Sequence, residues 1–212
     1  MLGATNTAPV VWGGTALALL QLGHVMLLDD GTPLVTRFIE RGDAAALQEY
    51  VRSLSQLSRS SRFLGAASEL PRSELEQSLR VGDGGRFSLI AEITVGGVPH
   101  IVAEARYALN GQDNSVEIAL SIHDQWQRHG IGMAIMSDLE CRAAALNADS
   151  VFGDMLGTNA GMRALAAKRG YAFERTPGDW RLLRFRKSVT ALHGQPCVCL
   201  AEARVPGAVV RS

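Results

Sequence analysis

The chain has 212 residues, of which 47% are hydrophobic and 20% are charged, values typical of a globular protein. This length suits one domain with a sizeable core, or one domain with a small appendage. Lys and Arg together number 21, as do Asp and Glu, so the formal net charge is zero. A neutral chain lacks the basic surface that nonspecific nucleic-acid binding requires, and it gives no reason to expect docking on an anionic membrane.

An uncharged stretch over residues 10–28 is about as long as a membrane span. It contains glycines, a glutamine and a histidine, and no Lys or Arg precedes it. We therefore interpret it as a short helix over 15–21 followed by a strand over 24–28. The prediction is a cytoplasmic protein with no membrane segment.

The three cysteines, Cys141, Cys197 and Cys199, make an odd count, and their spacing does not indicate a disulfide framework. We expect free thiols in a reducing compartment. Cys197, Cys199 and the nearby His193 supply fewer ligands than a structural metal site usually has, so no metal is expected.

The first third of the chain predicts strands and then helices. Two apolar runs around an Asp-Gly step predict a hairpin over 24–39. The helical spacing of Leu47, Val51 and Leu54 predicts a helix, for which Asp43 is the expected N-cap.

A second helix is expected to begin at Ser73, because Ser73 and Glu76 have the spacing of a capping box. Strands and helices then alternate to the end of the pattern. The expected strands are 87–95, 99–109, 115–122, 150–156, 171–173 and 179–187, and the expected helices are 130–146 and 159–169. This order predicts one α/β domain.

A polar turn follows the strand over 115–122, and Gly130 and Gly132 then lie at the mouth of a helix. The first N–H groups of a helix have no intrahelical partner and carry the positive end of its dipole. Glycines let that backbone approach a ligand closely, so the segment is typical of a phosphate or pyrophosphate cradle. A turn whose glycines only relieve crowding is the alternative, and the spacing alone does not separate the two.

Two other phosphate-binding motifs are excluded. A P-loop requires Lys and then Ser or Thr after its last glycine, whereas Met133 follows Gly132. A dinucleotide fingerprint requires a third glycine and an acidic residue at the end of the next strand, and neither is in the right place.

The loop resembles a known family. Gln127, Gly130 and Gly132 match the Q/R-x-x-G-x-G/A motif of the GNAT superfamily of acyl-CoA-dependent N-acyltransferases. The segments DQWQRHGIGMAIMSDLECRAAALNADSV (124–151) and GDMLGTNAGMRALAAKRGYAF (153–173) are similar to the family's cofactor loop with its long helix and to its later Asn-helix segment. Residues 29–65 resemble the opening of the bacterial protein-lysine acetyltransferase subgroup, and the whole resemblance spans roughly 27–186.

The resemblance implies a single α/β (α+β) domain whose mixed, mostly antiparallel sheet is splayed at the cofactor strand and flanked by helices. This domain would span 23–187, with an N-terminal extension over 1–22 and a C-terminal strand or tail over 188–212. The implied activity is acetyl-CoA-dependent acetylation of a primary amine, on a protein lysine or a small molecule, by direct attack. A noncatalytic acyl-CoA-binding sensor or regulatory module is the alternative.

The resemblance also assigns cofactor-binding residues. Main-chain groups of the splayed strand would bind the pantetheine arm, and the loop would bind the pyrophosphate. Asn159 matches the family Asn that bonds pantetheine, although an N-cap of the following helix is the simpler interpretation. The implied set is Leu120, Ser121, Ile122, Gln127, Arg128, His129, Gly130, Ile131, Gly132, Met133 and Asn159.

Two carboxylates are candidates for the base that the attacking amine requires. Glu117 lies ten residues before Gln127, the position of a functional Glu in the resembled subgroup, and alternation places it on one face with Ala119 and Ser121. Asp154 lies on the next strand, five residues before Asn159. For both, a structural ion pair or a solvated strand position is the alternative.

The chain departs from the family at the position of the usual proton donor. Many relatives have a Tyr on the helix after the Asn, whereas this chain has Ala166. Tyr171 aligns with an aromatic residue that is usually packed in the core, so the general acid is unassigned.

The expected partner is an amine acceptor, with no nucleic acid and no membrane. In this fold the first helices and the late strands usually shape the acceptor groove, here around Ser53–Leu70 and Thr176–Arg186. Many relatives pair through late strands, so the resemblance is compatible with a homodimer.

Overall fold

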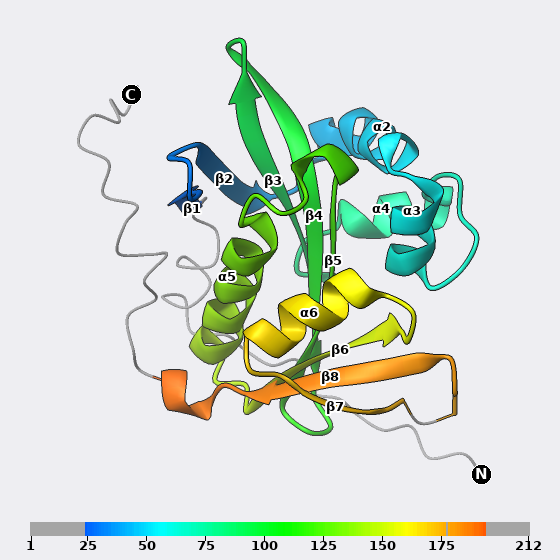
Figure 1. Ribbon diagram of the computed structural model, residues 1–212, viewed down its shortest axis with the longest axis vertical. Coiled ribbons are helices and arrows are strands. Elements are labelled where there is room, and N and C mark those ends of the chain that lie inside the picture. Colours follow the sequence, from blue (N-terminus) through cyan, green and yellow to red (C-terminus); the bar gives the residue numbers. More distant parts are fainter. Residues whose placement is uncertain (1–23, 177, 194–212) are drawn as a thin grey trace.

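The computed structural model describes residues 24–176 and 178–193 (Figure 1). Within this part of the chain, one eight-stranded sheet has the order β1-β2-β3-β4-β5-β6-β8-β7. All neighbouring strands are antiparallel except β5 and β6, which are parallel. The predicted fold class, a mixed and mostly antiparallel sheet flanked by helices, is confirmed. The expected helix over 15–21 lies outside the described residues, and the domain limits at 22/23 and 187/188 stay predictions.

The strands agree closely with the sequence pattern. They are β1 (His24–Leu27), β2 (Pro33–Phe38), β3 (Arg86–Val95), β4 (Val98–Asn110), β5 (Ser115–Ile122), β6 (Ser150–Leu156), β7 (Ala172–Arg175) and β8 (Leu182–Ser188). The α-helices are α2 (Ala44–Ser53), α3 (Gln56–Phe63), α4 (Arg72–Ser78), α5 (Ile131–Ala145) and α6 (Ala160–Lys168). Short 3₁₀ turns are η1 (Arg41–Asp43), η2 (Asp83–Gly85), η3 (Asp124–Trp126) and η4 (Thr190–Leu192).

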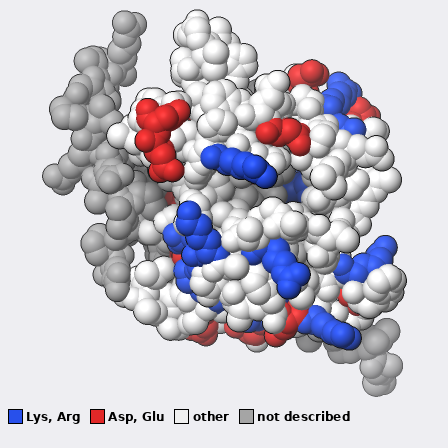
Figure 2. Space-filling view, viewed as in Figure 1, with Lys and Arg blue, Asp and Glu red and all other residues white. Residues whose placement is uncertain are grey.

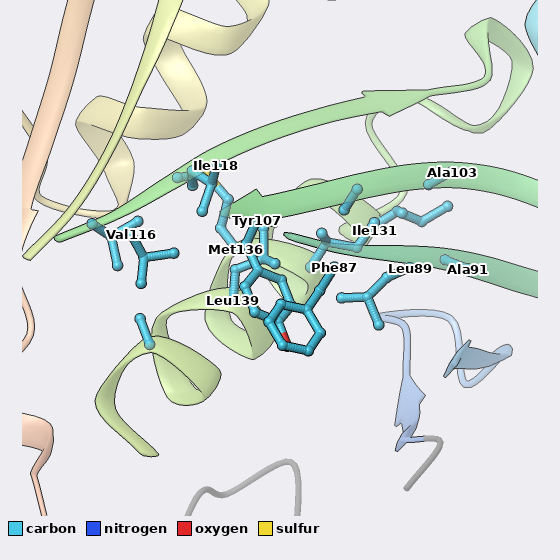
Figure 3. Close-up of a cluster of buried hydrophobic side chains, with 14 of the residues drawn as sticks. Phe87, Leu89, Ala91, Ala103, Tyr107, Val116, Ile118, Ile131, Met136 and Leu139 are labelled. Carbon is cyan, nitrogen blue, oxygen red and sulfur yellow. The ribbon is translucent and has the colours of Figure 1, made fainter. Parts of the chain in front are cut away.

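The helices form two layers, with α5 and α6 on one side of the sheet and α2, α3 and α4 on the other (Figure 1). The larger core lies between α5 and the sheet (Figure 3). In it the rings of Phe87 and Tyr107 stack with centroids 4.7 Å apart, and Met136 of α5 is fully buried. Along β5, Val116 and Ile118 belong to this core. Because side chains alternate along a strand, Glu117, Ala119 and Ser121 face the other helical layer.

Three sequence-based details of the helices are wrong. A single helix was expected where the chain forms α2 and then α3, because Leu54 is extended (ψ 146°) and Ser55 caps a new helix. Asp43 is the residue before α2, but its carboxylate accepts hydrogen bonds from Arg37 instead of capping the helix. Helix α4 begins at Arg72 and has no side-chain cap, so Ser73 and Glu76 lie inside it and form no capping box.

Among the described residues, no helix is both long and apolar enough to cross a membrane. Cys141, half-buried on α5, is disulfide-bonded, which corrects the expectation of a free thiol at this position. No group of three or more potential metal ligands occurs in the part of the chain that the structure describes.

Candidate active site

The sheet opens between β5 and β6. These strands pair only at Ser115–Glu117 and Ser150–Phe152, whereas β5 pairs with β4 along its whole length. Gly153 lies at the point of separation, where an added Cβ would lie 2.6 Å from the carbonyl oxygen of Ile118 and 2.4 Å from Cζ of Phe185. The second half of β5 therefore has a neighbouring strand on one side only.

The main-chain groups of β5 divide between the two sides. The N–H of His123 donates to the carbonyl of Val102 on β4 (2.8 Å). Because backbone direction alternates along a strand, Ser121 also faces β4, whereas Leu120 and Ile122 face the opening. Of the three residues expected to offer main-chain groups, Ser121 is the exception, and its buried hydroxyl instead lies 3.0 Å from the hydroxyl of Tyr50.

The loop after β5 has an irregular backbone. Arg128 and Gly130 both have left-handed conformations, with φ of 67° and 84°, while Gln127 has a φ of −69°. Such alternation of φ directs successive N–H groups toward a common side, which favours an anion. The first bond of α5 is donated by Ala134 to the carbonyl of Gly130, so the amides of Ile131, Gly132 and Met133 have no partner within the helix.

Gly132 lets three elements meet. A Cβ at this position would lie 2.9 Å from Cδ2 of Leu165 on α6 and 3.2 Å from Cδ1 of Ile122 on β5. The first turn of α5 thus lies against β5 and against α6, which fixes its free amides at the end of the gap. Figure 2 shows basic side chains in the middle of this face, over α6 and the upper end of α5, with acidic groups on either side of the upper ones.

Ser55, the N-cap of α3, and Ser58 within that helix hold the loop in place. The carboxylate of Asp124 accepts hydrogen bonds from the Ser55 amide (2.8 Å), the Ser55 hydroxyl (2.7 Å) and the Ser58 hydroxyl (2.7 Å). Burial raises the pKa of Asp124, but these bonds outweigh it, so the pKa lies below its usual value. Gln127 donates from Nε2 to the carbonyl of Ile122 (3.2 Å) and to the Ser58 hydroxyl (3.3 Å). Its side chain therefore joins the loop to β5 and α3.

Asn159 is the N-cap of α6, where its Oδ1 accepts a hydrogen bond from the amide of Met162 (3.0 Å). Ala166 is fully buried, so the face of α6 that carries it is packed against the core. Tyr171 is buried as well, and its ring packs edge-on against Phe185. The structure thus places Tyr171 in the core, as expected.

The two candidate bases have different surroundings. Glu117 is exposed on the face of β5 that is turned toward α3 and α4, where it lines a cavity of about 270 Å³. Asp154 is mostly buried, and both its oxygens accept hydrogen bonds from Arg184 (2.9 and 2.8 Å), with a third bond donated by Thr176 (2.9 Å). Both oxygens of Asp154 are thus held in contacts with neighbouring side chains, whereas Glu117 is exposed to the cavity.

A buried ion-pair cluster beside Glu117 was not predicted. Glu104 is 3% exposed and accepts hydrogen bonds from Arg62 (2.9 and 3.1 Å) and Arg106 (2.5 Å). The signal was present in the sequence, because Glu104 and Arg106 alternate on one face of a central strand, where charges require partners. Ser55 and Ser58 were expected only within the acceptor groove around Ser53–Leu70, and their contacts with the loop were not predicted.

A mostly antiparallel sheet that opens beside a glycine-rich loop and a helix N-terminus is the arrangement of the GNAT fold. No protein-family model matches the chain. The chain is similar to a curated acetyltransferase of Pseudomonas aeruginosa, with 26% identity over 166 residues that cover 78% of this chain and 89% of the relative.

Solved structures agree. The GNAT domain of S. lividans PAT is 20% identical and superposes with a TM-score of 0.71, covering 84% of this chain and 99% of that domain. Spermidine N-acetyltransferase from Vibrio cholerae, solved in complex with CoA and spermine, is 16% identical with a TM-score of 0.59, covering 73% of this chain and 95% of that one. These structures confirm the GNAT fold.

Proposed function

We propose that the protein is an acetyl-CoA-dependent N-acetyltransferase that acts on a primary amine. The observation that carries the proposal is the opening between β5 and β6, which ends at the free amides of α5. A strand edge and a helix N-terminus at one site suit a ligand that has both amide groups and a diphosphate. Similarity to an acetyltransferase along most of both chains supports the same activity.

The residues present fit this cofactor. The amides of residues 128–133 would bind the diphosphate, with the Arg128 guanidinium adding charge. The outward carbonyl of Leu120 and the outward amide of Ile122 would bind the pantetheine arm, since the Ile122 carbonyl accepts from Gln127. Asn159 would join them through Nδ2, which has no hydrogen bond among the described residues while Oδ1 caps α6.

Acetyl-CoA, when bound, supplies an acetyl group as a thioester. An amine must lose a proton to attack it, and we assign Glu117 as the base because its carboxylate is exposed and forms no ion pair among the described residues. The amide of Leu120 faces the opening and is our candidate donor to the carbonyl oxygen as negative charge develops there. With Ala166 buried, no side chain of α6 is assigned as the general acid, and water would protonate the leaving thiolate.

The test measures binding and turnover separately. Calorimetry with coenzyme A should give heat in the wild type and none in Gly130→Glu, which puts a side chain at a left-handed position and a negative charge in the anion site. Thiol release with a panel of amines and lysine peptides should fall about 10²-fold in Glu117→Gln, with cofactor binding intact. No binding of coenzyme A would refute the proposal, whereas binding without turnover on any acceptor would indicate a sensor.

A further inference from the structure

The sheet has a hollow beside Glu117, on the side that faces α3 and α4. In one row across β3, β4 and β5, Arg86 pairs with Ala108 and Ala108 pairs with Glu117. In the next row on the same face, Arg106 lies between Ser88 and Ala119. The small side chains of Ala108, Ser88 and Ala119 form the base of the hollow. The long side chains of Arg86, Arg106 and Glu117 surround them.

Helices cover part of this hollow. Gln77 and Ser78 of α4 and Arg62 of α3 line it together with the strand residues, and its volume is about 270 Å³. Both helices lie on the side of the sheet away from α5 (Figure 1). The volume is that of a site for a small molecule.

The charged groups that line the hollow are the carboxylate of Glu117 and the guanidiniums of Arg62, Arg86 and Arg106. Arg62 is committed to Glu104, which it contacts through Nε and Nη2. Arg106 contacts Glu104 through Nε, and its Nη1 lies 3.9 Å from the half-exposed carboxylate of Glu74. Its Nη2 is buried without a hydrogen-bond partner.

Arg86 is exposed and has no ion pair among the described residues. The buried Nη2 of Arg106 has no hydrogen-bond partner, which costs free energy, and an acceptor oxygen of a bound ligand would satisfy it. Arg86 on β3 and Arg106 on the middle strand β4 therefore offer donors to a carboxylate, while Glu117 on β5 attracts a cation.

We propose that the acceptor is a small molecule that carries both its primary amine and a carboxylate, an α- or ω-amino acid. Arg86 and Glu117 are two strand spacings apart, about 10 Å between their backbones, and both line the hollow. This distance suits a carboxylate and an ammonium separated by a few bonds. The inference rests on the proposed function, because it takes Glu117 as the base that receives the amine.

The experiment compares acceptors in matched triplets. Each amino acid, with its amide and with its decarboxylated amine, is tested by thiol release from acetyl-CoA, beside a lysine peptide. At least one amino acid should be acetylated with a kcat/KM about tenfold or more above its amide and amine, because the site's donors are left unpaired by those analogues. Preference for the peptide, or equal rates within every triplet, would overturn the inference and leave the proposed function standing.

Variants separate recognition from folding. Arg86→Gln removes the positive charge of an exposed side chain. It should raise KM for the amino acid about tenfold, with little change for its decarboxylated amine. Arg106→Gln should act in the same direction, although it also disturbs Glu104. Arg72→Gln, on the outer surface of α4 with a side chain that is 91% exposed, is the matched control and should change neither value.

A binding measurement decides the case in which coenzyme A binds and no acceptor is acetylated. N-acetylated amino acids are then titrated by calorimetry into the protein saturated with coenzyme A. Binding that Arg86→Gln weakens supports the carboxylate site. Absence of binding overturns it. If coenzyme A itself does not bind, it is the proposed function that fails.

Discussion

Ser55 and Asp124 are joined by two hydrogen bonds although 69 residues separate them in the chain. Ser55 is the N-cap of α3, and its hydroxyl also accepts a hydrogen bond from the amide of Ser58. Asp124 begins the turn that leads to Gln127 and the free amides of α5. The same contact thus caps one helix and anchors the loop that presents another, which couples α3 to the cofactor site.

Asp124→Asn should weaken binding of coenzyme A about three- to tenfold, because a neutral amide accepts fewer of the three hydrogen bonds that hold the loop. Calorimetry provides the measurement. Asp83→Asn, an exposed Asp in η2, is the control and should bind as the wild type does. Unchanged affinity in Asp124→Asn would mean that the loop keeps its shape without this anchor.

The same carboxylate predicts a pH dependence. The pKa of Asp124 is lowered in the folded protein, so its contribution is present above the pKa of the unfolded state, about 3.9, and is lost as the pH falls through the folded value. Coenzyme A affinity of the wild type should therefore approach that of Asp124→Asn only below about pH 4. Convergence of the two at neutral pH would contradict this assignment.

Gly153→Ala should lower the free energy of unfolding by about 1–3 kcal/mol, because the added Cβ has no room beside Phe185 and the Ile118 carbonyl. Gly157→Ala is the matched control. Its Cβ would meet only the Arg181 carbonyl at 3.5 Å, an ordinary contact, so little change is expected there. Urea denaturation of both variants measures the difference, and equal stabilities would show that β6 shifts freely.

Glu104→Gln should lower the free energy of unfolding by about 3–5 kcal/mol at neutral pH, since it leaves the buried guanidinium of Arg62 without its counter-charge. Burial raises the pKa of Glu104, but the positive charges of Arg106 and Arg62 lower it by more, so the pKa lies below its usual value. The stabilisation is thus complete above about pH 4.3 and fades as the pH falls below it. Urea denaturation at pH 7 and pH 3 should show the difference between variant and wild type shrinking at the lower pH.

Local patterns predicted most of the fold. Alternation over 115–122 and 150–156 matches β5 and β6 residue for residue, because each strand has one face in the core. The break between α2 and α3 was missed, because Leu54 keeps the helical spacing and is buried while its backbone is extended. A buried side chain of this kind fits the periodic pattern whether or not the backbone is helical.

The candidate site was predicted only in part. The loop over 127–133 was found because glycines and a helix start are local signals. The anchoring of Asp124 by Ser55 joins segments far apart in the chain, and a single sequence does not reveal such pairs. The orientation of Ser121 toward β4 also depends on strand register, which follows from the whole sheet.

Asp154→Asn should leave kcat within about threefold of the wild type, whereas Glu117→Gln should lower it about 10²-fold. The reason is that both oxygens of Asp154 are bonded to Arg184, and the variant loses part of that ion pair while keeping a partner for Thr176. Its free energy of unfolding should fall by about 1–2 kcal/mol. Steady-state kinetics across pH, with urea denaturation of the same samples, separates the two effects. A kcat loss in Asp154→Asn as large as that in Glu117→Gln, with unchanged stability, would make Asp154 the base, because a purely structural carboxylate affects folding before it affects the chemical step.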